Sequence, residues 1–109
     1  MSYQHKELAG GRWFELDLAE QLANIGSEVE RAILWRDRNE DYSRKAFYRV
    51  LELLELTLSD KKNRKYSLLK ELCRLKEVLI DFFCGDNNFS SSDELMRKYF
   101  YAFAYMARR

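Results

Sequence analysis

Residues that could carry out chemistry are sparse in this chain of 109 residues. The single histidine, His5, lies near the N-terminus, and no serine or cysteine has a plausible histidine base nearby. Di-iron bundles require Glu-x-x-His motifs, and no predicted helix contains a histidine. The adjacent glycines Gly10 and Gly11 do not follow a strand, as a phosphate-binding loop requires. We therefore expect no catalytic residue, cofactor or metal site, and we predict that the protein is not an enzyme.

The two cysteines do not suggest a disulfide or a zinc site. Cys73 and Cys84 fall on one predicted helix, which places their Cα atoms about 16 Å apart at 1.5 Å per residue. A disulfide needs a Cα separation below about 7 Å, and the spacing matches no zinc motif. We expect both cysteines to be reduced and to act as small apolar side chains.

The composition indicates one helical domain with a hydrophobic core. Hydrophobic residues make up 47% of the chain and aromatic residues 15%, and there is no proline, so disorder is excluded for most of it. We expect residues 1–12 to be a flexible leader and residues 13–109 to be a single domain. No apolar signal segment or membrane-length run is present, which predicts a cytoplasmic protein with no membrane partner.

The clearest helical periodicity is in residues 42–58. At 100° per residue the apolar side chains form two adjacent seams that together cover roughly 160°. A seam this wide requires two neighbouring helices, which a bundle supplies. The opposite arc is charged and is expected to be solvated, with ordinary ion pairs rather than an acid–base pair; it holds Arg44, Lys45, Arg49, Glu52 and Glu55.

Three more segments have the same periodicity: residues 14–37, residues 66–84, and a last helix that starts after Ser91. The sequence therefore predicts an all-α fold, an antiparallel up-and-down four-helix bundle. In the first helix, Asp17 and Glu20 could form a capping box. A flat strip beside its seam would let a second helix come close; the strip consists of Ala19, Ala23 and Gly26.

The ends and flanks of the helices carry further predictions. Gly85 is expected to end the third helix in the left-handed conformation, and Ser91 with Glu94 to open the last one as a capping box. The favoured interpretation of Trp13 and Trp35, which flank the first helix, is edge packing rather than a binding surface. Two cations lie within apolar arcs, and snorkelling is favoured over a buried ion pair for both; they are Arg36 and Lys76.

The charge is nearly balanced overall but differs between the two halves. The formal net charge of +1 gives no nucleic-acid signature for the whole chain. Residues 1–55 carry a net charge of −3 and residues 56–109 a net charge of +4. A polyanion is therefore expected to meet the second half, although the basic run at 61–65 has the character of a solvated loop.

The outer face of the last helix is the candidate interaction surface. Its inward face is predicted to contain Leu95, Met96, Tyr99, Phe100, Ala102, Phe103, Met106 and Ala107. The remaining outer residues are Arg97, Lys98, Tyr101, Tyr105 and Arg108. Tyrosine and arginine are enriched in protein interfaces, and rings with arginines also suit single-stranded RNA. The third alternative is that one or both tyrosine rings lie against a neighbouring helix or the N-terminal leader.

Two resemblances accompany these patterns. The stretches GRWFELDLAEQLANIGSEVERAI and DELMRKYFYAFAYMARR resemble those of a group of small, uncharacterised bacterial helical proteins, which implies no activity. More remotely, the size and helix count are similar to the bundles encoded by intervening sequences in ribosomal RNA and to HEPN domains. HEPN ribonucleases carry Arg-x4–6-His on a late helix. Here no histidine follows Arg97, so the resemblance implies a non-catalytic member.

The prediction is therefore a non-enzymatic interaction module that self-associates, as a homodimer, or binds another protein. The alternative is a non-catalytic RNA-binding bundle. Both predictions rest on the outer face of the last helix, so they differ in the partner and not in the surface.

Overall fold

The computed structural model describes residues 11–108, and these residues form four α-helices with no strand among them. The helices are α2 (Leu18–Trp35), α3 (Glu40–Ser59), α4 (Tyr66–Cys84) and α5 (Asp93–Ala107), with two short 3₁₀ helices, η1 (Arg12–Glu15) and η2 (Lys61–Asn63). The all-α four-helix prediction is confirmed. The expected leader, including His5, lies outside the described residues except for Gly11 and Arg12, and Arg12 already begins η1.

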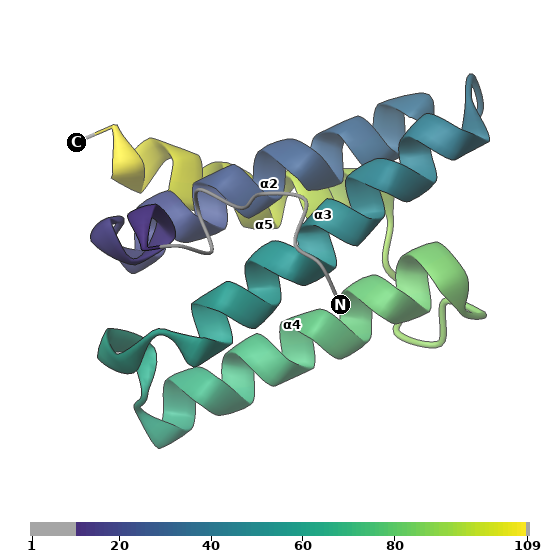
Figure 1. Cartoon of the computed structure of the whole chain (residues 1–109). Helices are drawn as coiled ribbons and strands as arrows, with labels where there is room; N and C mark the ends of the chain where they lie inside the picture. The colour runs from purple at the N-terminus through teal and green to yellow at the C-terminus, as the bar shows by residue number, and fades with distance from the viewer. Residues whose placement is uncertain (1–10, 109) are drawn as a thin grey trace.

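Figure 1 shows that the chain runs back across the molecule with each successive helix. The helix α2 packs along both α3 and α5, and α4 lies against the other side of α3. The two neighbours expected for residues 42–58 are therefore α2 and α4. The closest packing, however, surrounds α2 and not that helix.

Small residues explain why α2 is approached so closely. A Cβ atom on Gly26 would lie 2.6 Å from Cβ of Phe100 on α5, so the predicted close approach at this glycine is confirmed. On the α3 side, the Ser43 hydroxyl donates a 2.6 Å hydrogen bond to the backbone carbonyl of Ala32. A side chain as short as serine can reach the backbone of another helix only where the two helices nearly touch.

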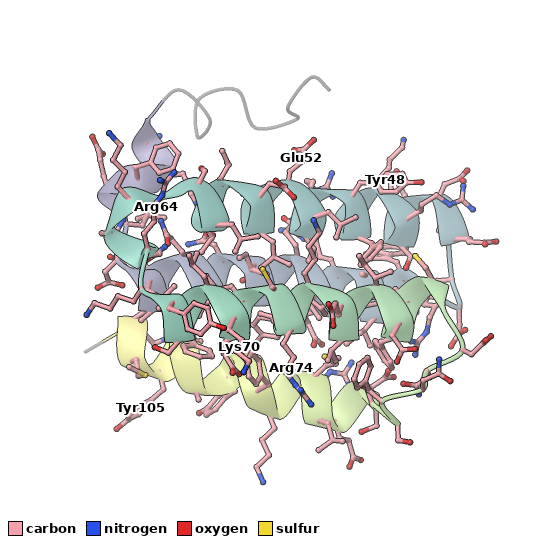
Figure 2. All side chains as sticks on the ribbon, turned by 90° about the horizontal axis from the view of Figure 1, so that it is seen from below. Tyr48, Glu52, Arg64, Lys70, Arg74 and Tyr105 are labelled. Carbon is pink, nitrogen blue, oxygen red and sulfur yellow. The ribbon has the colours of Figure 1, made fainter. Side chains whose placement is uncertain are left out.

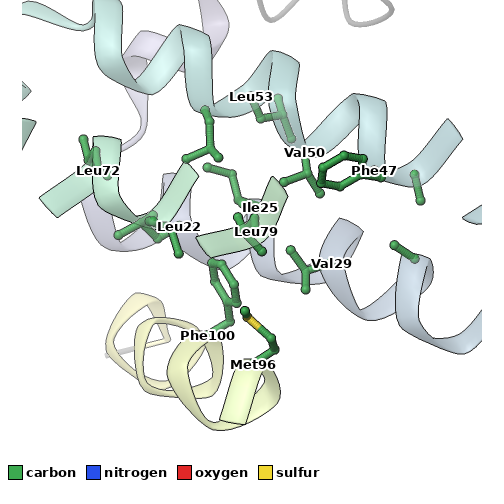
Figure 3. Close-up of a cluster of buried hydrophobic side chains, with 14 of the residues drawn as sticks. Leu22, Ile25, Val29, Phe47, Val50, Leu53, Leu72, Leu79, Met96 and Phe100 are labelled. Atoms are coloured by element: carbon green, nitrogen blue, oxygen red, sulfur yellow. The ribbon is translucent and has the colours of Figure 1, made fainter. Parts of the chain in front are cut away.

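The core lies between all four helices (Figure 3). Leu22, Ile25 and Val29 of α2 are buried with Val50 of α3, and Leu79 of α4 is fully buried beside them. The α4 contribution consists of bulky side chains, and ring contacts such as Phe47 to Phe83, with centroids 5.0 Å apart, join it to α3. Because α4 contains no alanine or glycine, it stands farther from the bundle than α5 does.

The helix starts and ends follow the sequence with three corrections. The first helix begins at Leu18 rather than Phe14, because the residues before it form η1. The capping box of Asp17 and Glu20 is present, with bonds of 2.8 and 3.1 Å. The N-cap of α5 is Ser92 and not Ser91. Gly85 ends α4, but its φ is −104° rather than left-handed.

The turn after α4 is built by an acidic side chain. The carboxylate of Asp81 accepts hydrogen bonds from the backbone N–H groups of Asn88 and Phe89. The positive φ values of this turn lie at Asn87, 55°, and Ser90, 54°. At Gly85 the space is tight, since a Cβ there would lie 3.1 Å from Cα of Asp81.

Several side chains lie elsewhere than predicted. Glu52 was assigned to the solvated arc, but it is only 5% exposed, so this assignment is wrong; the predicted core positions Ala46, Val50 and Leu54 are buried, so the phase of α3 is right. Cys73 and Cys84 are free, as expected, but exposed on α4. Arg36 and Lys76 each form an ion pair with an acid on another helix, with N···O distances of 2.9 and 2.7 Å. The side chains of both pairs are partly exposed.

A buried polar cluster fastens η1 and η2 to the ends of α2 and α3. The side chain of Gln21 donates to the carboxylate of Asp60 at 2.8 Å and accepts from the Asn63 amide at 2.9 Å. The indole N–H of Trp13 donates to the Thr57 hydroxyl at 3.1 Å. All five side chains are buried. Edge packing is thus confirmed for Trp13, whose polar atom is satisfied as burial requires.

Hydrogen-bond donors of Lys62 and Gln21 stabilise the charged form of Asp60. Burial alone would raise the pKa of this carboxyl group, but the hydrogen bonds from the Lys62 ammonium group, the Gln21 amide and the Lys62 backbone outweigh it. The pKa of Asp60 therefore lies below its ordinary value of 3.8.

We predict that Gly26→Ala loosens the contact between α2 and α5. The clashing atom is Cβ of Phe100, which no rotamer can move, so the α5 backbone must shift. Overpacking costs about 1–3 kcal/mol and the gain in helix propensity returns about 1, so a net loss of up to about 2 kcal/mol is expected in urea unfolding. Ser27→Ala, at the next and exposed position, should stay within about 0.5 kcal/mol. A Gly26→Ala protein more stable than wild type would contradict the close approach.

We predict an acid-sensitive contribution from Asp60. Because its folded pKa is depressed, the stabilisation is complete above the unfolded pKa and is lost as pH falls through the folded pKa. Asp60→Asn, which presents an amide donor to surrounding donors, should cost about 1.5–3 kcal/mol at pH 7.

The measurement is the urea midpoint of both proteins between pH 7 and pH 3. The difference between wild type and Asp60→Asn should narrow toward pH 3, as the wild-type carboxyl group becomes protonated. A difference that stays constant over this range would mean that Asp60 is not held as a charged hydrogen-bond acceptor.

Candidate functional site

The five residues predicted for the interaction surface all lie on the exposed side of α5. The cap at Ser92 starts the helix, and Met96 and Phe100 are buried. Tyr101 and Tyr105 therefore point outward and are 68% and 58% exposed. Figure 2 shows Tyr105 directed away from the bundle. The alternative in which these rings lie against the rest of the described chain is wrong. We call Arg97, Lys98, Tyr101, Tyr105 and Arg108 the α5 surface.

An open groove runs beside Tyr101 between α2 and α5. Its volume is about 500 Å³, and its walls are mostly small or apolar; they include Ala23, Gly26, Ser27, Phe100 and Ala104. A shallower hollow continues past Ala107 to Arg108. From Arg97 to Arg108 the groove follows about 16 Å of helix at 1.5 Å per residue. This is long enough to seat about three turns of another helix.

Arg97 is already engaged by an acid across the groove. Its Nε donates to both carboxylate oxygens of Glu30, at 3.1 and 2.8 Å. This hydrogen bond raises the pKa of the Arg97 guanidinium group above its ordinary value. The pair joins α2 to α5 at one end of the groove, and its net charge is zero.

The opposite flank of α5 is more open than predicted. Leu95, Ala102 and Met106 were expected to face inward, but all three are exposed. Leu95 borders a hollow of about 210 Å³ between α4 and α5, which is also lined by Leu75 and Tyr99. Burial, and then the charge of Glu71, raise the pKa of Tyr99 above its ordinary value.

A third hollow, which the sequence did not reveal, lies on the α2/α3 side of the molecule. Its volume is about 150 Å³, and it is lined by two cations and two aromatic rings, Arg31, Trp35, Tyr42 and Arg49. The spacing of Arg31 to Trp35 on one helix, and of Tyr42 to Arg49 on the next, was the available signal. The two pairs form one hollow only because α2 and α3 pack side by side in the folded chain.

Two classes of site find no support in the part of the chain that the structure describes. No group of histidine, cysteine, aspartate and glutamate side chains in residues 11–108 converges where a metal ion could bind. Over the same residues, no helix combines the length and apolar character needed to cross a membrane.

Comparison with known protein families, with characterised proteins and with solved structures finds no match. The resemblance to HEPN and intervening-sequence bundles therefore stays a prediction. Function has to be argued from the surfaces themselves.

Proposed function

We propose that this protein is a non-enzymatic interaction module that self-associates through the α5 surface and the adjoining groove. The observation that carries the proposal is the position of Tyr101, an exposed ring at the rim of an open groove of about 500 Å³. Tyr105, one turn farther along α5, extends the same exposed apolar area.

The chemistry of the surface suits protein packing. Tyrosine combines a large apolar ring with one polar atom and is enriched among the residues that dominate binding energy. The groove walls include Ala23, Ser27 and Ala104, whose short side chains would let a partner helix come close. In a dimer, the projecting tyrosine rings of one copy can thus pack into the small-walled groove of the other copy.

A second copy of this chain is a partner that this surface can accommodate. A two-fold interface places the same patch on both sides, so the patch must be complementary to itself. The exposed rings and the small-walled groove meet this requirement, and the Arg97–Glu30 pair is already balanced within each copy. The formal net charge of +1 adds no general repulsion between copies.

The alternative, a non-catalytic RNA-binding role for the same surface, has weaker support. The exposed rings could stack on bases. The charge of Arg97, however, is balanced by Glu30, which leaves Lys98 and Arg108 as the cations of this surface for phosphates.

The test is the solution mass of the purified protein by light scattering over a range of concentrations. Wild type is expected to have the mass of a dimer, and Tyr101→Ser/Tyr105→Ser that of a monomer, because the ring contacts are lost. The matched control is Tyr48→Ser/Tyr66→Ser, which removes two exposed tyrosines from α3 and α4 and should remain dimeric. Since burial of apolar area drives association, the dimer should depend little on salt.

Two results would contradict self-association. One is a monomer at every concentration. The other is a dimer that the control variant disrupts as strongly as Tyr101→Ser/Tyr105→Ser does. A monomer that purifies with RNA, and whose affinity falls steeply with salt and less steeply after Arg108→Ala, would establish the alternative.

A further inference from the structure

Two arginines and two aromatic rings converge on the hollow between α2 and α3. Arg31 and Trp35 are one turn apart on α2, and Tyr42 and Arg49 are two turns apart on α3, so each pair lies on one face of its helix. The four side chains line a concavity of about 150 Å³. This hollow lies on the α3 side of α2, whereas the α5 surface lies on the other side. The two sites are therefore separate.

A single buried acid fixes both cations. Glu28 is 8% exposed, and its two carboxylate oxygens accept from Nη1 of Arg31 at 2.8 Å and from Nε of Arg49 at 3.0 Å. The group of three thus keeps a net positive charge of one. Each of these bonds uses one nitrogen of its guanidinium group. Guanidinium forks match the oxygens of a phosphate.

The rings are positioned by each other. The centroids of Trp35 and Tyr42 are 5.4 Å apart with an interplanar angle of 60°, an edge-to-face arrangement. The residues remain 38% and 55% exposed, so the pair is held in place but not covered. Lys45 follows Tyr42 by three residues and precedes Arg49 by four, which adds a third cation to this side of α3.

We infer that this hollow binds single-stranded nucleic acid, with an unpaired base stacked on the exposed aromatic pair and a neighbouring phosphate held by Arg31 and Arg49. Aromatic rings beside a basic groove are the features that such binding requires. A duplex keeps its bases stacked inside and cannot use the rings. An acidic peptide could use the arginines, but it would leave Trp35 and Tyr42 without a role.

The cations are oriented before any ligand arrives. Glu28 is buried and bonds to both guanidinium groups, so ligand binding does not have to order them, and its entropic cost is lower.

The test uses a fluorescently labelled single-stranded octamer of adenylate, and the measured quantity is its anisotropy when the full-length protein is added at low salt. Wild type should bind, and Trp35→Ala should weaken binding about tenfold, the loss expected for one stacked base. Arg31→Ala should lower the magnitude of the slope of log affinity against log salt by about 0.7, as one phosphate contact is lost. Arg31 lies on the exposed rim, so this variant is expected to fold; circular dichroism checks that it does.

The matched control is Lys70→Ala, which removes one positive charge from α4 (Figure 2) and should leave affinity unchanged. The inference is wrong if the octamer does not bind at low salt, or if Lys70→Ala weakens binding as much as Arg31→Ala does. It is also wrong if a glutamate octamer competes as well as the RNA while Trp35→Ala has no effect, since the site would then recognise acidic peptides. Binding that Trp35→Ala and Arg31→Ala each weaken, and Lys70→Ala does not, establishes it.

Discussion

The contact between Gly26 and Phe100 determines how the rest of this bundle is arranged. At this point α2 and α5 are so close that even one added methyl group would lie 2.6 Å from the neighbouring Cβ. The contact fixes the rotation of α5 about its axis, because Phe100 must face α2. With Phe100 inside, Tyr101 lies at the groove between the two helices and Tyr105 points to solvent. The exposed surface of α5 is thus a consequence of a packing constraint on its other side.

The helices are unequally spaced because the side chains at their contacts differ in size. Small residues bring α3 and α5 close to α2, whereas the leucine and phenylalanine side chains of α4 hold that helix farther away. Interhelical distance depends on side-chain size at the contact. A bundle with one distant helix has open flanks, which is why Leu95 and Met106 are exposed. At one end of the bundle, the buried polar cluster holds the chain together: the hydrogen bond between Gln21 and Asp60 joins α2 to the end of α3.

The sequence was sufficient for the elements and for part of the site. The period of 3.6 residues located four helices, the pair Asp17 and Glu20 marked the start of α2, and the exposure of Tyr101 and Tyr105 followed from the phase of α5. These features depend on one helix at a time. The exposure of Leu95 depends on which helices are neighbours and at what distance, and periodicity carries no such information. The hollow at Trp35 and Arg49 was missed for the same reason, since its members come from two helices.

The central claim is that the α5 tyrosines are open in the single chain and become covered when copies associate. Hydroxyl-radical footprinting at increasing protein concentration measures this directly, residue by residue. The account predicts that Tyr101 and Tyr105 react strongly in dilute protein and become protected as the dimer forms, while Tyr66 on α4, which is largely exposed, reacts equally throughout. Equal reactivity of Tyr101 and Tyr105 at every concentration, or protection already in the monomer, would contradict it.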